Sequence, residues 1–300
     1  MQVHYGLKGL KLNNSVATIG SFDGVHAGHV VIIKRIKELA KKYNGETVII
    51  TFDPHPRKVL YPHTTGKDLK MIYTIEEKID RLSSLGVDHL VIIPFTIEFS
   101  QISSTSFIVD ILLKQLSLLC MVVGFNHYFG HNKSGDFSLL YYLSKRYKFY
   151  VEEIPEKDIH HESMSSTLVR EALSHGWIKK VNSYLQSKYF FFGNIQQVKT
   201  ESVIDNGQLV ITGLKDRNKL LPPEGTYSVT VFVNNKQYNA LLWSFYNDPE
   251  ICIQINTTDK LEEGSKMRIE FSELLSDFTT MKSSDEMNAS IKSDFYSICK

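Results

Sequence analysis

Apolar and polar positions follow two alternating periods along the first 185 residues. Continuous apolar runs predict buried strands at residues 15–20, 46–52, 89–95, 119–125 and 148–154. Between them apolar residues recur at helical spacing. The clearest helix starts near His29, buries Val30 and Ile33, and ends before Asn44-Gly45. Further helices are expected from a capping box at residues 74–77, from Ser103, and over residues 137–146 and 165–176. Repeated strand–helix units predict an α/β domain with a Rossmann-like, doubly wound parallel sheet.

The pattern changes after residue 186. Short runs rich in aromatic and β-branched residues predict strands at residues 188–195, 208–214, 226–233, 236–245, 250–255 and 266–271. Glycine- and asparagine-containing turns separate them, which is typical of a small antiparallel β-barrel or a sandwich. A polar C-terminal helix is expected over residues 284–298. We therefore expect two domains, residues 1–185 with the parallel sheet and residues 186–300 with the second fold, for which we favour the barrel.

The composition adds few constraints. The 300-residue chain has a formal net charge of +1, so its overall charge does not indicate binding to nucleic acid or to an anionic membrane. Its three widely spaced cysteines, Cys120, Cys252 and Cys299, fit a reducing compartment better than a disulfide framework. The N-terminal residues lack an apolar core of signal-peptide length, and polar residues interrupt the apolar stretch 106–125. A cytoplasmic protein is expected.

The stretch TIGSFDGVHAGH, residues 18–29, carries the strongest chemical signal. It follows a predicted strand and precedes a predicted helix, whose N-terminal N–H groups and partial positive charge suit phosphate. Its glycines allow the backbone to approach a ligand closely. His26 and His29, three residues apart on the first turn, can both face a phosphorus centre that gains negative charge. The stretch therefore predicts phosphate chemistry.

Two other interpretations of this stretch compete with that one. A His-x-x-His pair is also a fragment of many metal sites, and His55, His127 and His131 are candidate third ligands, but no carboxylate or thiolate holds a fitting spacing. We therefore expect no protein-bound metal. The glycines and Asp23 also suit an ordinary turn. However, several motif-bearing turns follow predicted parallel strands, which would bring their polar residues to one edge of the sheet.

Five segments, in order over about residues 1–180, resemble a known family. They are GSFDGVHAGH, TFDPHP, PFTIEFSQISSTSFI, VVGFNHYFGHNKSGD and SSTLVREAL. The first is similar to the HxGH signature of the nucleotidyltransferases, and the set resembles the prokaryotic FAD synthetases, which usually join an FMN adenylyltransferase to a riboflavin kinase. The resemblance implies that the chain converts ATP and FMN into FAD and pyrophosphate. Mg²⁺ is expected to enter with ATP, because no cage of carboxylates is visible.

The resemblance also implies roles for individual residues. The catalytic residues would be His26, His29 and Arg170. The remaining ATP contacts would be Gly20, Ser21, Phe22, Asp23, Gly28, Ser165, Ser166 and Thr167. The FMN contacts would be Phe52, His55, Asn126, Tyr128 and Phe129. Plainer roles stay open: an ordinary helix cap for the hydroxyls, a turn for His55 and a solvated charge for Lys133.

The resemblance continues into the second domain, but two functional signatures are missing. The segments YFFFGNI and LLPPEGTYSVTVFVNNKQYNALLW resemble a riboflavin kinase barrel. The family's phosphate- and magnesium-binding Gly-Phe-Pro-Thr-Ala-Asn segment should lie between Gly193 and Leu220, where no Pro-Thr pair occurs. Its catalytic glutamate should fall near residues 251–261, which offer Gln254, Asn256 and Thr257 instead. We expect a degenerate barrel without kinase activity. It would support the first domain, mediate association between copies or bind flavin without reaction.

Three rival functions stay open at this point. They are a bifunctional enzyme with displaced kinase motifs, a nucleotidyltransferase for another phosphate compound, and a non-enzyme such as a flavin or nucleotide sensor or an interaction protein. The aromatic loops and the barrel disfavour the second. The set of His26, His29 and Arg170 disfavours the third, because a binding module would not need all of it. The expected partners are thus ATP, FMN, FAD and pyrophosphate, with no nucleic acid and no membrane, and with a homo-oligomer left open.

Overall fold

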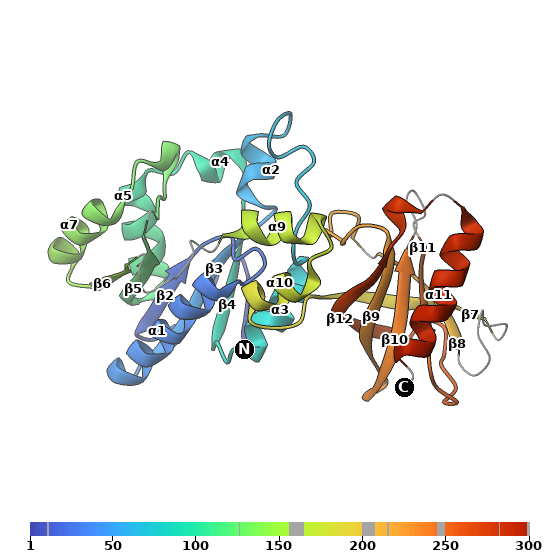
Figure 1. Cartoon of the computed structure of the whole chain (residues 1–300). Coiled ribbons are helices and arrows are strands. Elements are labelled where there is room, and N and C mark those ends of the chain that lie inside the picture. Colours follow the sequence, from blue (N-terminus) through green and yellow to red (C-terminus); the bar gives the residue numbers. More distant parts are fainter. Residues whose placement is uncertain are drawn as a thin grey trace. The chain divides into compact units, whose positions relative to one another are not determined.

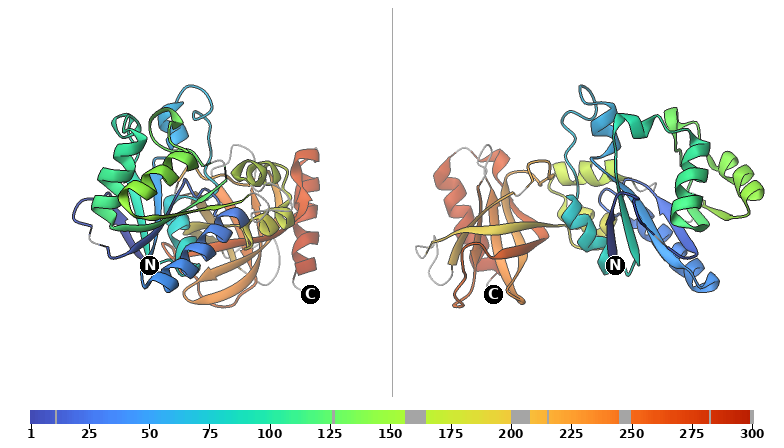
Figure 2. Two further views of the ribbon diagram at one scale, coloured as in Figure 1. Left: turned by 90° about the vertical axis from the view of Figure 1, so that its left-hand side faces the viewer. Right: turned by 180° about the vertical axis from the view of Figure 1, so that it is seen from behind.

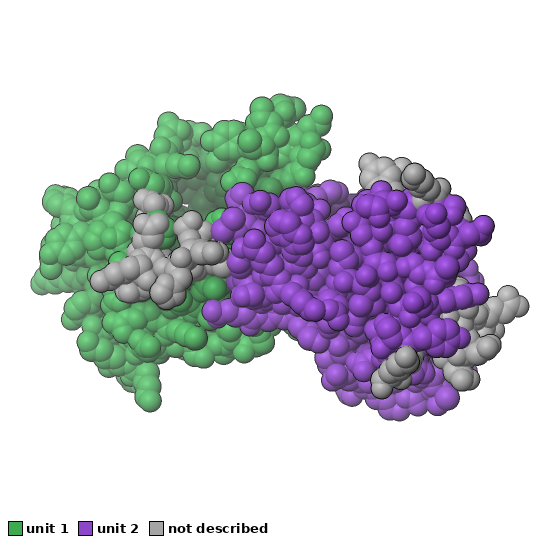
Figure 3. Space-filling view, viewed as in Figure 1, with its two compact units in different colours: residues 1–69, 78–165 green, residues 70–77, 166–300 purple. Residues whose placement is uncertain are grey.

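The computed structural model describes residues 1–10, 12–125, 127–155, 165–199, 208–214, 216–244, 250–281 and 283–298. Contacts within the chain divide it into two compact units (Figure 3). Unit 1 comprises residues 1–69 and 78–165, and unit 2 comprises residues 70–77 and 166–300. The division of activities expected at residue 185 stays a prediction, because these units are defined by packing and not by function.

Unit 1 contains a parallel sheet, as the sequence pattern predicts, and this sheet has six strands, one more than the pattern indicates (Figure 1). Its strands are β1 (Gln2–Tyr5), β2 (Ser15–Ile19), β3 (Glu46–Asp53), β4 (His89–Pro94), β5 (Leu118–Gly124) and β6 (Tyr150–Ile154). Their order in space is β1-β4-β3-β2-β5-β6. The chain leaves β2 through β3 and β4 and then crosses back to β5, on the other side of β2. This reversal is the topological switch point, beyond whose carboxyl ends sheets of this kind bind ligands.

Helices cover both faces of this sheet, because its central strands are buried along most of their length. Helix α1 (Ala27–Tyr43) packs on β2, β3 and β5, and it buries Val30, Ile33 and Ile36. A π-helix, η1 (Phe107–Leu113), continues into α6 (Lys114–Leu116). The buried side chains of η1, α6 and α7 (Phe137–Tyr147) share one apolar cluster with alternate strand residues. The smaller helices of this part of the chain are α2 (Pro56–Leu60), α4 (Ile97–Ser100), α5 (Ser104–Ser106) and η2 (His131–Lys133).

The structure confirms the predicted sheet and adds elements that the sequence pattern did not indicate. The edge strand β1, the short helix α2 and the helix α10 (Ile178–Leu185), which follows α9 (Ser166–Ser174), were not expected. The π-helix was expected to be an α-helix. Its buried residues Phe107, Ile108, Ile111 and Leu112 have the spacing of an α-helical face, so their pattern cannot distinguish the two.

Unit 2 contains a closed antiparallel barrel of six strands, which decides between the barrel and the sandwich. The strands are β7 (Phe190–Lys199), β8 (Gln208–Leu214), β9 (Gly225–Val233), β10 (Lys236–Ser244), β11 (Glu250–Ile255) and β12 (Lys266–Asp277). Their order around the barrel is β10-β11-β8-β7-β12-β9, and the pairing of β9 with β10 closes it. Closure leaves this sheet without a free edge. β12 runs beyond its predicted end, with two irregularities in its pairing to β9.

The predicted C-terminal helix α11 (Ser284–Ile298) lies against the outside of the barrel (Figure 2). Its residues Ile291 and Phe295 pack with Leu241 and Trp243 of β10 and with Phe278, which opens the short helix η3 (Phe278–Thr280). Each such side chain contributes about 1.5–3 kcal/mol when it is withdrawn from water. The helix is therefore an integral part of unit 2.

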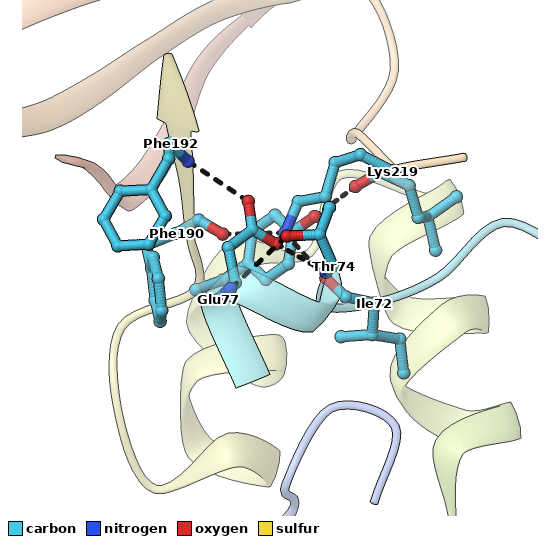
Figure 4. Close-up of polar contacts among 8 residues, drawn as sticks. Ile72, Thr74, Glu77, Phe190, Phe192 and Lys219 are labelled. Carbon is cyan, nitrogen blue, oxygen red and sulfur yellow. Dashed lines mark hydrogen bonds and ion pairs between the residues drawn. The ribbon is translucent and has the colours of Figure 1, made fainter. Parts of the chain in front are cut away.

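A buried ion pair ties residues 70–77 to the barrel within unit 2 (Figure 4). Lys219 Nζ donates hydrogen bonds to Glu77 Oε2 at 2.7 Å, to the carbonyl oxygen of Ile72 at 2.7 Å and to that of Phe190 at 2.8 Å. The two paired side chains are 1% and 2% exposed. A charge this deeply buried is costly unless its donors are all satisfied, and the three acceptors match the three donors of an ammonium group.

Candidate active site

The two segments that carry most of the predicted ligand contacts lie at the switch point of the sheet. β2 pairs in parallel with both β3 and β5, so the carboxyl ends of these strands share one edge. The turn of residues 20–26 follows β2, and the loop of residues 125–136 follows β5. Asn126, one of the predicted FMN contacts, lies outside the described residues. The structure thus brings the predicted ATP turn and the predicted flavin loop to one edge of unit 1.

The turn after β2 has an unusual backbone conformation. Phe22 and Val25 have φ angles of +46° and +44°, and Gly24 has +85°. The left-handed region costs a non-glycine residue about 1 kcal/mol or more, and most for bulky or β-branched side chains. The turn is nevertheless largely buried, and Gly20 N donates to the carbonyl oxygen of Ile50 at 3.0 Å. Strain of this kind persists only where the surroundings enforce it, and it clusters at functional sites.

The N-terminus of α1 lies at the end of this turn, and the side chain of its N-cap residue makes no capping hydrogen bond. His26 is the N-cap residue, and the first helical hydrogen bond runs from Val30 N to the carbonyl oxygen of His26. The N–H groups of Ala27, Gly28 and His29 therefore have no partner within the helix. The first turn also contains no acidic residue that would neutralise the helix dipole. This end of α1 is suited to an anion such as phosphate.

The two predicted catalytic histidines are stacked on each other. Their ring centroids are 3.8 Å apart, and the ring of Phe22 lies 4.6 Å from that of His29 on a tilted plane. Burial, together with the charges of His26 and Lys78, holds the pKa of His29 well below its ordinary value. His29 is therefore neutral at pH 7, with one donor and one acceptor nitrogen. Its Nδ1 is buried and accepts or donates no hydrogen bond among the described residues.

Lys78 is a further charged residue at this turn, and the sequence pattern did not single it out. Its side chain in α3 (Ile75–Ser84) is buried, and Nζ donates to the carbonyl oxygen of Ser21 at 2.7 Å. A lysine in an amphipathic helix normally faces solvent, so its spacing alone gives no signal of a functional position. Only the fold shows that this ammonium contacts the turn of residues 20–26.

The loop after β5 is tightly fixed to its neighbours. Phe129 and Gly135 exchange backbone hydrogen bonds of 3.0 and 2.9 Å, and Ser104 Oγ donates to the carbonyl oxygen of Phe129 at 3.2 Å. Gly130 has a φ of +73°, and a Cβ at this position would lie 2.6 Å from Ser104 Cα. Phe129 is buried in the core of unit 1, whereas Tyr128 is 54% exposed. Of these two aromatic residues, Tyr128 is the one with an accessible ring.

His127 lies in the same loop and has a strongly perturbed pKa. Its ring stacks on that of Phe129, with centroids 6.0 Å apart. Burial lowers its pKa to about 4, so it is neutral at physiological pH. Its Nε2 has no hydrogen-bond partner among the described residues. The sequence indicates this residue only as a candidate metal ligand, because no pattern predicts that its ring is enclosed.

Phe52, near the end of β3, and His55, just after it, have different surroundings. Phe52 packs against Phe95 and Phe99, with ring centroids 5.3 and 5.9 Å away. His55 is the N-cap residue of α2, and its Nδ1 accepts a hydrogen bond from Arg57 N at 3.1 Å. The plainer role of His55, as a turn residue, is thus observed. Contact of either residue with a ligand stays a prediction.

The remaining predicted ATP contacts are divided between the units. Ser165 is the last residue of unit 1, whereas Ser166, Thr167 and Arg170 belong to α9 in unit 2. Arg170 Nε donates to the carbonyl oxygen of Lys70 at 3.3 Å, a contact within unit 2. The role of these residues at an ATP site stays a prediction.

The barrel positions expected to carry kinase chemistry hold neutral side chains. Gln254 in β11 is fully buried, and neither atom of its amide has a hydrogen-bond partner in the described residues. Asn256 and Thr257 follow the end of that strand. Of the interval expected to hold the phosphate-binding segment, residues 200–207 and 215 lie outside the described residues.

Metal-site and membrane-spanning features are both missing from the parts of the chain that the structure describes. Over the described ranges, no cluster of three or more His, Cys, Asp or Glu side chains has the arrangement of a metal site. None of the helices found in the described part of the chain is both long and apolar enough to cross a membrane.

Comparison with known proteins gives a consistent family match. Residues 10–168 match the family model described as FAD synthetase. Proteins named bifunctional riboflavin kinase/FMN adenylyltransferase are similar over most of the chain. The one from Listeria monocytogenes is 31% identical over 78% of this chain and 73% of its own length, and the one from Bacillus subtilis is 30% identical over 86% and 83%. The one from Buchnera aphidicola of Acyrthosiphon pisum is 32% identical over 65% of this chain, which spans 62% of that protein, less than two thirds of its length.

A solved structure shares the whole fold. It is described as a macrolide-efflux protein from Streptococcus pneumoniae, with a TM-score of 0.84 and 21% sequence identity. The match covers 100% of this chain and 99% of the other. At this identity the likeness concerns the fold alone.

Proposed function

Because the chain belongs to the FAD synthetase family, we infer that it transfers the adenylyl group of ATP to FMN and releases FAD and pyrophosphate. One observation supports the site of this reaction above the others. The N-terminus of α1, with no acidic residue in its first turn, and the stacked pair of His26 and His29 lie at the switch point of the parallel sheet. The helix N-terminus, the two imidazole rings and this edge of the sheet are each suited to binding phosphate.

In the proposed reaction, a phosphate oxygen of FMN attacks the α-phosphorus of ATP. The bond from the α-phosphorus to the bridging oxygen breaks, and pyrophosphate leaves with that electron pair. The nucleophile is already an anion, so no serine or cysteine nucleophile is needed. Catalysis then consists of holding two anions in line and stabilising the charge that develops between them.

His26 and His29 would stabilise this charge, with the backbone N–H groups of Ala27 and Gly28. His29 is neutral before ATP binds, because burial and neighbouring charges lower its pKa. Before ATP binds, the neutral ring of His29 can therefore be buried in the first turn of α1 without the cost of a buried charge. The negative phosphates would raise the pKa of His29 and so allow it to hold a proton against them.

The other predicted contacts complete the proposal. Arg170 would pair its forked donors with β- or γ-phosphate oxygens, and the hydroxyls of Ser165, Ser166 and Thr167 would lie beside them. Tyr128, with its exposed ring, would stack on the flavin, and Phe52 and Phe129 would support that pocket. His55 and Asn126 would supply polar contacts.

We further propose that Mg²⁺ enters with ATP, bound mainly to its phosphates. The described residues fit this arrangement, because they hold phosphate donors at α1 but no cluster that could cage a cation by itself. When bound, the ion neutralises part of the triphosphate charge. A cytoplasmic location is proposed as well, since three widely spaced cysteines with no CxxC pair fit a reducing compartment better than a disulfide framework.

We propose that residues 1–185 carry the adenylyltransferase activity and that the barrel of residues 186–300 lacks the kinase activity. The absence of a Pro-Thr pair between Gly193 and Leu220, and the amides of Gln254 and Asn256 where a catalytic carboxylate is expected, support this. An amide cannot accept the proton of the riboflavin hydroxyl as a general base does.

One assay tests both proposals. The purified full-length protein is mixed with ATP and MgCl₂, and with either FMN or riboflavin, and the flavins are separated by chromatography. We expect FAD from FMN and neither FMN nor FAD from riboflavin. FMN formed from riboflavin would show that the barrel is a kinase. Lack of FAD in the FMN arm would contradict the adenylyltransferase assignment.

A further inference from the structure

The ammonium of Lys78 is an unusual charged group of unit 1, because it is buried. Its residue is 3% exposed, although it is the fourth residue of an amphipathic helix. Nζ donates to the carbonyl oxygen of Ser21 at 2.7 Å and contacts Thr51 Oγ1 at 3.4 Å. Thr51 Oγ1 donates to the same carbonyl oxygen at 3.1 Å. Two donors from two different elements therefore converge on one carbonyl group of the nucleotide turn.

Burial removes this ammonium from water and so lowers the pKa of Lys78. The nearby carboxylates of Asp23 and Asp53 act in the opposite direction and raise it. Asp23 is itself buried, at 1% exposure, and belongs to the same turn. Lysines are almost never buried this far without a specific partner. The position of Lys78 is thus a costly arrangement that serves the turn rather than the helix.

The turn needs such support because of its backbone. Phe22 and Val25 are held at positive φ, a conformation that is unfavourable for both side chains. Ser21 immediately precedes Phe22, so its carbonyl group sets the peptide plane from which the strained segment begins. The same segment ends at His26, the N-cap residue of α1. A change at the Ser21 carbonyl would therefore be transmitted to the helix N-terminus and to both histidines.

We propose that Lys78 is a positioning residue for adenylyl transfer. Its ammonium fixes the Ser21 carbonyl, and through it the turn of residues 20–26, in the conformation that receives the triphosphate. It also adds a positive charge that acts, together with burial and His26, to keep the ring of His29 neutral until phosphates arrive. This inference rests on the proposed function of the turn, but it concerns a residue that the phosphate motif does not include.

The test compares the full-length protein with Lys78→Met, which keeps the length of the side chain but removes its charge. We expect kcat/KM for ATP to fall at least tenfold, while KM for FMN stays within twofold. Lys34→Met, the same change at an exposed lysine of α1, serves as the control and should stay within twofold in both constants. A Lys78→Met enzyme within twofold of the wild type would overturn the proposal.

A second measurement reads the charge of Lys78 without turnover. Burial lowers the pKa of His29 most, and the charges of His26 and Lys78 lower it further, so removal of the ammonium should raise this pKa. Titration of the ring signal by NMR in the free protein should show this upward shift. A variant that loses activity while His29 titrates as in the wild type would reduce Lys78 to a structural contact and contradict the proposal. If the wild type forms no FAD, the proposed function fails, but this titration still tests Lys78.

Thr51→Val is the milder variant, needed if Lys78→Met does not fold. It removes one of the two donors to Ser21 and no charge. We expect a three- to tenfold loss of kcat/KM for ATP with an unchanged His29 titration. A rate equal to that of the wild type would show that the Ser21 carbonyl needs no fixing, and would overturn the proposal.

Discussion

Glu77 accepts a hydrogen bond from Lys219 across 142 residues of sequence, at 2.7 Å, with both side chains buried in unit 2. The carboxylate accepts two further hydrogen bonds. Glu77 Oε2 accepts from Thr74 N at 2.8 Å, and Oε1 accepts from Phe192 N at 3.1 Å. The capping box predicted at residues 74–77 is therefore real, and the same carboxylate that completes it also holds a strand of the barrel.

Loss of Lys219 should destabilise the protein severely. Lys219→Met would leave the Glu77 carboxylate buried without its counter-charge, which typically costs about 3–5 kcal/mol. Urea-induced unfolding, followed by circular dichroism, measures the change. Lys236→Met is the control, because Lys236 forms an exposed ion pair with Asp259 at 2.9 Å and its loss should have a far smaller effect. Equal losses in the two variants would contradict the importance assigned to burial.

His29→Ala should lower the rate of FAD formation at least a hundredfold and leave the fold intact. The variant loses a donor that is already oriented toward the developing charge, and such donors are typically worth a factor of about 10²–10³ in kcat. FAD formation from FMN and ATP is measured beside the far-ultraviolet circular dichroism spectrum. His63→Ala, at an exposed histidine, should behave as the wild type. A near-normal rate for His29→Ala would refute its catalytic role.

Gly130→Ala should weaken FMN binding by disturbing the flavin loop. Its φ is +73°, and the new Cβ would lie 2.6–2.7 Å from backbone atoms of Ser104, which cannot easily move. We expect KM for FMN to rise and the free energy of unfolding to fall by about 1–3 kcal/mol. Gly9→Ala separates the effect of the positive φ from that of the steric contact. Gly9 has a similar φ of +77°, but an added Cβ there would meet no atom within 4 Å. If the free energy of unfolding falls no more for Gly130→Ala than for Gly9→Ala, the contact with Ser104 does not contribute.

His127 should make stability depend on pH between about pH 4 and 6.5. Its pKa is about 4 in the folded protein and about 6.5 when unfolded. In this interval the unfolded chain binds the additional proton, so the contribution is fully present above pH 6.5 and is lost as the pH falls. Between pH 7 and pH 5 this amounts to about 2 kcal/mol.

The variant His127→Phe keeps a ring at this position but cannot titrate. Its free energy of unfolding should therefore fall by about 2 kcal/mol less than that of the wild type when the pH is lowered from 7 to 5. Burial lowers the pKa of His29 in the same direction, but His29 is present in both proteins and cancels in the comparison. Parallel pH profiles for the two proteins would contradict the burial of His127 as a neutral ring.

The sheet and the barrel could be predicted because their signals are local and repeated. Buried parallel strands produce continuous apolar runs, and the αL conformation of Asn44 ends α1 where an Asn-Gly pair predicts it. Strand β1 gave no such signal. It has only four residues, forms the edge of the sheet and is partly exposed, so its pattern resembles that of a surface segment.

The two histidines of the proposed site could be selected from sequence as candidates, whereas Lys78 could not. His26 and His29 stand in a motif whose glycines and position before a helix indicate phosphate. Lys78 depends on a contact with Ser21, 57 residues away, which no local pattern encodes. The enclosure of His127 and the second role of Glu77 were missed for the same reason. Each depends on a tertiary contact between segments that are far apart in the sequence, and residue spacing does not predict such contacts.

The assignment of residues 70–77 to unit 2 has a consequence for protein engineering and for inheritance. Tyr73 in this segment stacks on Tyr189, and Glu77 pairs with Lys219, so unit 2 includes a peptide encoded well upstream of the barrel. Residues 1–185 and residues 186–300 therefore cannot be exchanged independently between related proteins. A chimera joined at residue 185 would give the barrel a foreign version of this peptide, and a recombination event that succeeds must carry both pieces together.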